Sequence, residues 1–150
     1  MVDVVSSETR SRMMSGIRGR NTRPELVVRR ILHASGFRFR LHVPDLPGKP
    51  DLVLRRWNAI IHIHGCFWHG HDCALFRLPA TRTEFWREKI ERNRSRDATV
   101  AEELERLGWR QLHVWECALK GPARVSTERL SARLASWLTS DSPKGEIRGH

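Results

Sequence analysis

The sequence lacks the long apolar runs that a membrane protein needs. Its longest apolar stretches are only a few residues, far below the ~20 residues that span a bilayer as a helix. The first ten residues, MVDVVSSETR, contain no apolar core of a signal peptide. We therefore expect neither secretion nor membrane insertion. Cysteine is also scarce, and three cysteines in a chain without an export signal favour reduced thiols or metal ligands over a disulfide framework.

Acidic residues are too few to balance the basic ones. The 150 residues include 27 Lys and Arg but only 17 Asp and Glu, which gives a formal net charge of +10. The surplus lies in residues 8–40 and 82–96, whereas the chain from residue 97 onward is balanced. Most of the surplus is arginine, whose planar guanidinium contacts phosphate oxygens in pairs. This favours a nucleic-acid partner, although a merely soluble, arginine-rich protein stays open on charge alone.

The pattern of apolar residues predicts one α/β domain that spans residues 1–150. It indicates helices over 22–35, 83–107 and 126–138, and strands over 37–43, 51–55, 59–64 and 109–115. A weaker helix is expected over residues 8–20, while residues 1–7 and 139–150 are expected to be flexible. This order of elements calls for a mixed sheet flanked by helices.

Four potential metal ligands surround a loop that has neither helix nor strand periodicity: Cys66, His71, Cys73 and Cys117. Three thiolates and one imidazole form a closed tetrahedral set for structural zinc. The spacing within the loop is irregular, so two alternatives stay open. Cys117 can instead be a small core residue with the histidines at the surface, or the zinc can be catalytic, with His64 or His69 as a competing ligand.

A carboxylate and several imidazoles are expected to meet at one edge of the sheet. Asp51 opens one predicted strand, and His62 and His64 end its neighbour. A carboxylate with backbone carbonyl oxygens suits Mg²⁺, and a nearby histidine can move a proton near neutral pH. Such a site fits phosphodiester hydrolysis. The non-catalytic alternatives are that Asp51 after Pro50 only belongs to a turn and that His69 is an additional zinc ligand.

Aromatic side chains accompany these groups. Phe67 and Trp68 lie inside the proposed zinc loop, where flanking ligands and glycines leave them little core to enter. Trp86 lies near the start of a basic helix and can equally be a core residue. Rigid aromatic side chains beside an arginine-rich surface can wedge between bases of DNA.

Several motifs together resemble the very short patch repair (Vsr) endonuclease family. They are residues 64–71 (HGCFWHGH), 78–86 (LPATRTEFW) and 114–117 (VWEC), with 9–11 (TRS) and 46–51 (LPGKPD) in support. The resemblance covers about residues 8–138. It implies a restriction-endonuclease-like core in the order αβββαβ. It also implies a Mg²⁺-dependent DNA endonuclease that nicks 5′ of the thymine in T:G mismatches left by deamination of 5-methylcytosine.

The same resemblance assigns roles to individual residues. Asp51 would be the principal Mg²⁺ ligand together with the backbone carbonyl of Ile63, His69 the catalytic histidine, and Glu25 and His64 supporting groups. The structural zinc ligands would be Cys66, His71, Cys73 and Cys117. The residues that intercalate into DNA would be Phe67, Trp68 and Trp86, with Met14 and Ile17 on an N-terminal helix in the minor groove. The acidic-x-Lys pair of restriction-type sites is absent, and His62-x-His64 takes its place.

The resemblance also implies partners and location. The substrate would be double-stranded DNA with a T:G mismatch, bound by a monomer, with a MutL-type mismatch-repair protein as a candidate partner in the bacterial cytoplasm and nucleoid. Two other functions stay open. One is a restriction-like nuclease that cuts unmodified duplex, and the other is a zinc-stabilised DNA-binding module without catalysis. Asp51 and His69 argue against the module.

Overall fold

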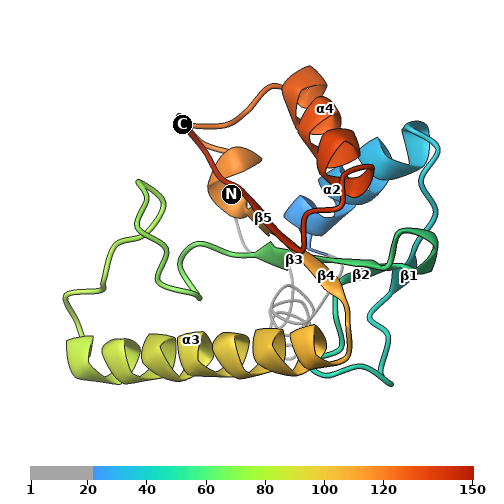
Figure 1. Cartoon of the computed structure of the whole chain (residues 1–150). Coiled ribbons are helices and arrows are strands. Elements are labelled where there is room, and N and C mark those ends of the chain that lie inside the picture. The colour runs from blue at the N-terminus through green and yellow to red at the C-terminus, as the bar shows by residue number, and fades with distance from the viewer. Residues whose placement is uncertain (1–21) are drawn as a thin grey trace, which may run out of the picture.

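A five-stranded mixed sheet with helices on both faces forms the protein (Figure 1). The computed structural model describes residues 22–150. The helices are α2 (Arg23–Ala34), α3 (Thr83–Arg106) and α4 (Thr127–Leu138), with single 3-10 turns η1 (Arg55–Trp57) and η2 (Glu116–Ala118). The strands are β1 (Arg40–Leu41), β2 (Leu52–Leu54), β3 (Ala59–His64), β4 (Arg110–Trp115) and β5 (Lys144–Ile147). The predicted N-terminal helix over 8–20, with Met14 and Ile17, lies outside the described residues.

The strands follow one another across the sheet in the order β1-β2-β3-β4-β5. The first three are antiparallel, whereas β3 pairs with β4 and β4 with β5 in parallel. A parallel pair needs a long crossover, and α3 supplies it between β3 and β4. The central strand β3 is buried over almost its whole length because helices cover both of its faces.

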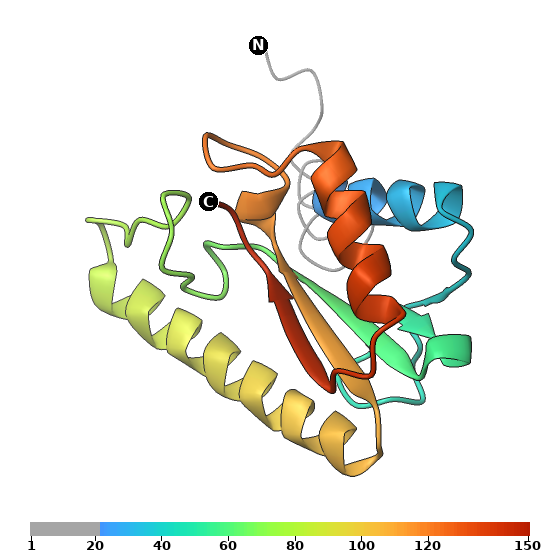
Figure 2. The ribbon, with the colours of Figure 1, turned by 45° about the horizontal axis from the view of Figure 1, so that its top comes forward.

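Two apolar cores fill the space between the sheet and the helices (Figure 2). Helices α2 and α4 bury Val28, Leu32 and Leu134 on one face. Helix α3 covers the other face, where Leu104 packs against Val53 and Ile60. Within residues 22–150, no helix combines the length and the apolar character needed to cross a membrane.

The α/β class and the mixed sheet flanked by helices are confirmed, and, with the 3-10 turn η1 set aside, the first six described elements follow the predicted order αβββαβ. The strand expected over 37–43 shrinks to two residues. At its start, the Phe37 amide closes the end of α2 by donating to the Leu32 carbonyl. At its end, His42 adopts a left-handed backbone conformation with φ 46°, which stops a strand.

The expectation of a flexible tail over residues 139–150 is wrong. Residues Lys144–Ile147 form β5, which adds a parallel strand to β4 and buries Ile147. Gly145 fits closely against Trp137, since a Cβ atom there would lie 2.5 Å from the indole nitrogen. An edge strand gains main-chain hydrogen bonds whatever its side chains are, so a short polar segment carries little sign of it.

Candidate active site and metal cluster

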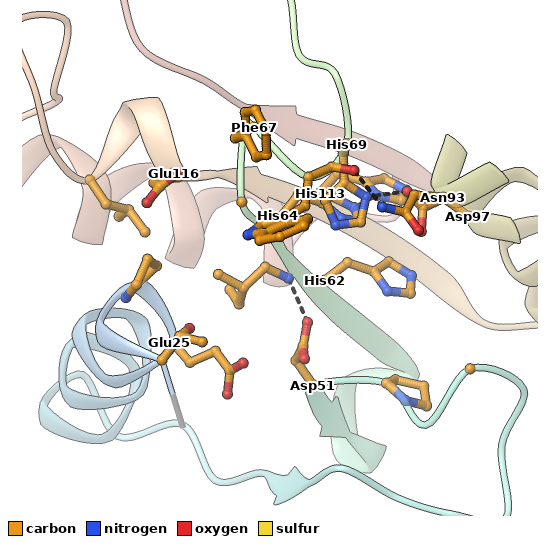
Figure 3. A pocket seen from close by; sticks show the side chains of 18 of the residues that line it. Glu25, Asp51, His62, His64, Phe67, His69, Asn93, Asp97, His113 and Glu116 are labelled. Carbon is orange, nitrogen blue, oxygen red and sulfur yellow. Dashed lines mark hydrogen bonds and ion pairs between the residues drawn. The ribbon is translucent and has the colours of Figure 1, made fainter. Parts of the chain in front are cut away.

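A cleft of about 990 Å³ opens where β3 and β4 end, between α2, α3 and the loop that follows β3 (Figure 3). The four residues predicted to act in catalysis line it: Glu25, Asp51, His64 and His69. Ile63, the predicted backbone ligand, lines it too. Basic side chains also face the cleft: Arg23, Lys49, Lys89, Arg96 and Lys120. The cleft therefore combines a carboxylate and imidazoles with positive charge, a combination that suits the binding and hydrolysis of a phosphodiester.

Asp51 is held at the floor of the cleft by β3. Its Oδ2 accepts a hydrogen bond of 2.8 Å from the Ile63 amide, as Figure 3 shows. Burial raises the pKa of this carboxyl from 3.8 to about 7, and the Glu25 charge adds to the rise, while the Ile63 amide opposes it. A buried carboxylate that is costly to ionise gains most from a bound cation. Asp51 therefore has the chemistry of a metal ligand.

Glu25 lies beside Asp51, on the first turn of α2. Its Oε2 accepts hydrogen bonds from Arg29 at 2.9 Å and from His42 Nε2 at 3.1 Å. Glu25, His42 and Asp51 each offer a ligand atom, and these atoms lie within 4.8 Å of one another. Thr22, the residue before α2, makes no side-chain cap hydrogen bond.

His69 is paired with a carboxylate that the sequence analysis missed. Its Nδ1 contacts Oδ2 of Asp97, which α3 carries to the cleft. One turn earlier, Asn93 donates to the Trp68 carbonyl at 2.8 Å and fixes the loop. A sequence signal for both exists. They share one helical face with Ile90 and Leu104, and polar residues inside an apolar stripe mark a functional site.

Three imidazoles stack on the α3 side of the sheet. The ring of His113 lies 4.7 Å from that of His62 and 5.0 Å from that of His64, and His64 lies 4.6 Å from His69. Burial lowers the pKa of His64 well below its usual value and that of His113 to about 4. His113 and Gln111, which binds His62 at 2.9 Å, were not singled out from the sequence.

The four predicted zinc ligands converge. Their ligand atoms lie within 4.8 Å of one another, and His71 Nδ1 is 3.6 Å from the sulfur of Cys66 and of Cys117. In a tetrahedron with zinc–sulfur bonds of ~2.3 Å and zinc–nitrogen bonds of ~2.0 Å, neighbouring ligand atoms are about 3.5 Å apart. The ring of His71 is stacked on Trp115 at 3.9 Å, which fixes its orientation. The donor set and its spacing therefore fit a closed tetrahedral metal site.

The chain end that was expected to be flexible packs over this cluster. The Gly149 amide donates to the Cys117 sulfur at 3.3 Å, and Arg148 pairs with Asp72, beside His71, at 2.9 Å. A Cβ atom at Gly149 would lie 2.6 Å from the Cys117 carbonyl oxygen, so only glycine fits there. Amide hydrogen bonds to ligand sulfurs orient them and stabilise their charge.

The aromatic residues form one cluster, in which Phe67 and Trp68 line the cleft. Phe67, Trp68 and Trp86 are half-buried, with ring centroids 5.2–5.9 Å apart. Trp86 thus packs against the loop rather than deep inside the core. Trp86 is carried by α3, next to Arg87 in the sequence.

Comparison with known proteins decides the family. The sequence model of the family described as DNA mismatch endonuclease Vsr matches residues 2–75. The DNA mismatch endonuclease Vsr of Escherichia coli (strain K12) is 44% identical over 147 residues, which cover 98% of this chain and 94% of that protein. The chain belongs to the Vsr family of DNA mismatch endonucleases.

Two proteins named as nicking enzymes also match most of the chain. The type II nicking enzyme V.XorIIP of Xanthomonas oryzae pv. oryzae is 48% identical over 119 residues, which cover 79% of this chain and 88% of that enzyme. The type II nicking enzyme V.NmeAIP of Neisseria meningitidis is 42% identical over 131 residues, which cover 87% of this chain and 93% of that enzyme. Membership in the Vsr family supports an endonuclease activity, for which the cleft around Asp51 and His69 is the candidate site.

Proposed function

We propose that the protein is a Mg²⁺-dependent endonuclease that nicks one strand of double-stranded DNA, 5′ of the thymine in a T:G mismatch. The observation that carries the proposal is the cleft, where Asp51 and the His69–Asp97 pair meet among basic side chains. In this proposal the mismatch arises by deamination of 5-methylcytosine. The enzyme acts as a monomer in the bacterial cytoplasm and nucleoid, with a MutL-type protein as a partner.

His69 is suited to proton transfer. The Asp97 carboxylate accepts the Nδ1 proton, so Nε2 is the ring nitrogen left for the cleft that His69 lines. A carboxylate behind an imidazole fixes its tautomer and stabilises the protonated ring. His69 can therefore take a proton from an attacking water or give one to the leaving oxygen.

Asp51, with the Ile63 carbonyl, would hold Mg²⁺. The bound cation supplies Lewis-acid stabilisation of charge on the scissile phosphate. Glu25 and His64 would order water and phosphate around it. Arg29 and His42 keep Glu25 in place for this role, since both contact its Oε2. The basic residues along the cleft attract the DNA backbone.

Structural zinc would be held by Cys66, His71, Cys73 and Cys117. The loop 65–73 carries His69, Phe67 and Trp68, and it has no regular secondary structure of its own. A closed zinc site would fix this loop to the end of β4, where Cys117 lies on η2. The metal would then position the catalytic histidine without touching DNA.

Phe67, Trp68 and Trp86 would recognise the mismatch by intercalation, with Met14 and Ile17 approaching from the minor groove. Separating stacked bases costs a few kcal/mol, and the cost is smallest at a mismatched step. Phe67 and Trp68 line the cleft and Trp86 packs against both, which supports a role of these half-buried rings in contacting DNA. The protein would thus read weakened stacking as well as base edges.

A panel of oligonucleotide duplexes tests the proposal. Each duplex carries T:G or the fully paired T:A in the same sequence, across several sequence contexts, and nicking is followed with Mg²⁺ present. We expect nicking of T:G duplexes in at least one context and none of the paired controls. Trp86→Ala should weaken binding to T:G DNA by about 1–3 kcal/mol and leave binding to paired duplex nearly unchanged. Equal cleavage of T:G and paired DNA would refute mismatch recognition.

A further inference from the structure

A hydrogen-bonded imidazole pair, His64 and His113, links β3 to β4 in the wall of the cleft. In the parallel register of these strands, His62 is opposite His113 and His64 is opposite Trp115. Alternate residues of a strand share one face, so all four side chains lie on the α3 side. His64 and His113 are stacked with an interplanar angle of 11°, and Figure 3 shows the two rings together beside His69.

The geometry of this pair allows a single bridging proton. His64 Nε2 lies 2.8 Å from His113 Nδ1, a distance at which one nitrogen must donate and the other must accept. His64 and His113 therefore cannot choose their tautomers independently. If His113 donates from Nδ1, His64 carries its own proton on Nδ1; if His64 donates from Nε2, its Nδ1 is bare.

The neighbouring imidazole, His62, donates its ring proton to another residue. Gln111 donates from Nε2 to the Ala101 carbonyl at 2.9 Å, so its Oε1 faces His62 as an acceptor. His62 therefore donates from Nε2 to Gln111. The hydrogen bonds from His62 through Gln111 to the Ala101 carbonyl therefore all run in one direction. The His64–His113 hydrogen bond is not part of this series.

The tautomer of His64 matters because His64 lines the cleft. Its Nε2 is engaged by His113, so Nδ1 is the nitrogen through which it can serve a ligand. A phosphate oxygen is an acceptor only and needs a donor opposite it. If Nδ1 of His64 carried no proton, its lone pair would face the phosphate oxygen, and two acceptors cannot form a hydrogen bond.

We propose that His113 is a positioning residue, which donates from Nδ1 to His64 Nε2 and thereby holds His64 in the tautomer whose Nδ1–H binds a DNA phosphate oxygen. The inference rests on the proposed nicking function for the identity of that acceptor. The second-layer partner of an imidazole commonly fixes its tautomer, and its loss typically costs about 10–100-fold in activity.

Two substitutions at one position separate hydrogen bonding from packing. His113→Phe keeps a flat ring in the stack but removes the nitrogen, whereas His113→Asn places a side-chain amide near the position of Nδ1. We expect His113→Phe to lower kcat about 10–100-fold with KM nearly unchanged, and His113→Asn to recover most of the loss. Gln111→Leu is the matched control, because it removes the bond to His62 from the same strand and should retain the wild-type kcat.

Combination with His64→Ala tests whether His113 acts through His64. His113→Phe should cause no further loss in the His64→Ala background. Wild-type kcat in His113→Phe, or an equal loss in both backgrounds, would overturn the inference. Nicking by His64→Ala at the wild-type rate would also overturn it while leaving the proposed function intact.

A spectroscopic measurement decides the inference even without nicking. The ¹⁵N chemical shifts of the His64 ring report which nitrogen carries the proton. We expect Nδ1 to be protonated in the wild type and the proton to redistribute to Nε2 in His113→Phe. A wild-type His64 protonated on Nε2 would overturn the assignment. Absence of nicking on every mismatch, by contrast, would refute only the proposed function.

Discussion

Asp51 should make the protein less stable at neutral pH than an uncharged residue would. Burial raises its pKa from 3.8 to about 7, so the folded state binds this proton more tightly than the unfolded chain does. The stabilising contribution of the proton is fully present below pH ~4 and is lost as the pH rises through about 7. The shift corresponds to at most about 4 kcal/mol, since each pKa unit is worth ~1.4 kcal/mol.

Asp51→Asn isolates this contribution. The asparagine Oδ1 can still accept from the Ile63 amide, and the variant differs from the wild type by one ionisable group only. In Mg²⁺-free buffer at pH 8, we expect the variant to be more stable by up to about 4 kcal/mol, with a gain of ~2 kcal/mol already decisive. At pH 4 the difference should vanish. Nicking should be abolished at both pH values, because the metal ligand is gone.

Urea unfolding of both proteins between pH 4 and pH 8 measures the difference. Chelating agents are left out so that the zinc proposed for the cysteine cluster stays bound. Other groups titrate alike in the two proteins and cancel in the comparison. A destabilised variant at pH 8, or a difference that does not change with pH, would refute the reasoning that burial makes this carboxylate costly and therefore suited to a cation.

Three further predictions concern the loop and its metal cluster. His69→Ala should lower the nicking rate by about 10²–10⁴ with unchanged zinc content; a loss of zinc would make this residue a ligand instead. Cys117→Ser should lower the bound zinc, measured by atomic absorption, and reduce the free energy of unfolding; wild-type protein purified with far less than one equivalent of zinc would contradict this. Gly149→Ala should speed zinc transfer to a chromophoric chelator, because its Cβ would collide with two backbone carbonyl oxygens, whereas His150→Ala should not; equal rates would show that the chain end does not protect the site.

The sequence was sufficient for features that depend on strong local patterns. The run Ala59–Ile61 is continuously apolar, which indicates a strand buried on both faces, and Ser126 caps α4 by accepting from the Arg129 amide. The convergence of Cys117 with the loop was also predictable, because it follows the strand that lies beside β3. Clustered donors of one chemical type are visible in a sequence even when their spacing is irregular.

The partners of the candidate catalytic groups depend on tertiary packing and left weaker signals. Asp97 lies 28 residues from His69 on a helix rich in charged residues, so its position within the apolar stripe is a weak signal and its partner is not visible in the sequence. His113 could be recognised as a partner of the other histidines only from the parallel register that sets it opposite His62. Strand β5 was missed because it forms through main-chain pairing at the sheet edge rather than through an apolar pattern.

Mapping of cleavage at single-nucleotide resolution tests the central claim most directly. One duplex with a single T:G mismatch is labelled on both strands and incubated with Mg²⁺ and either the wild type or Asp51→Asn. The account predicts one cut by the wild type, in the thymine strand immediately 5′ of the mismatched thymine, and no cut by Asp51→Asn. Cuts in both strands, a cut placed without regard to the mismatch, or equal cleavage by Asp51→Asn would contradict it.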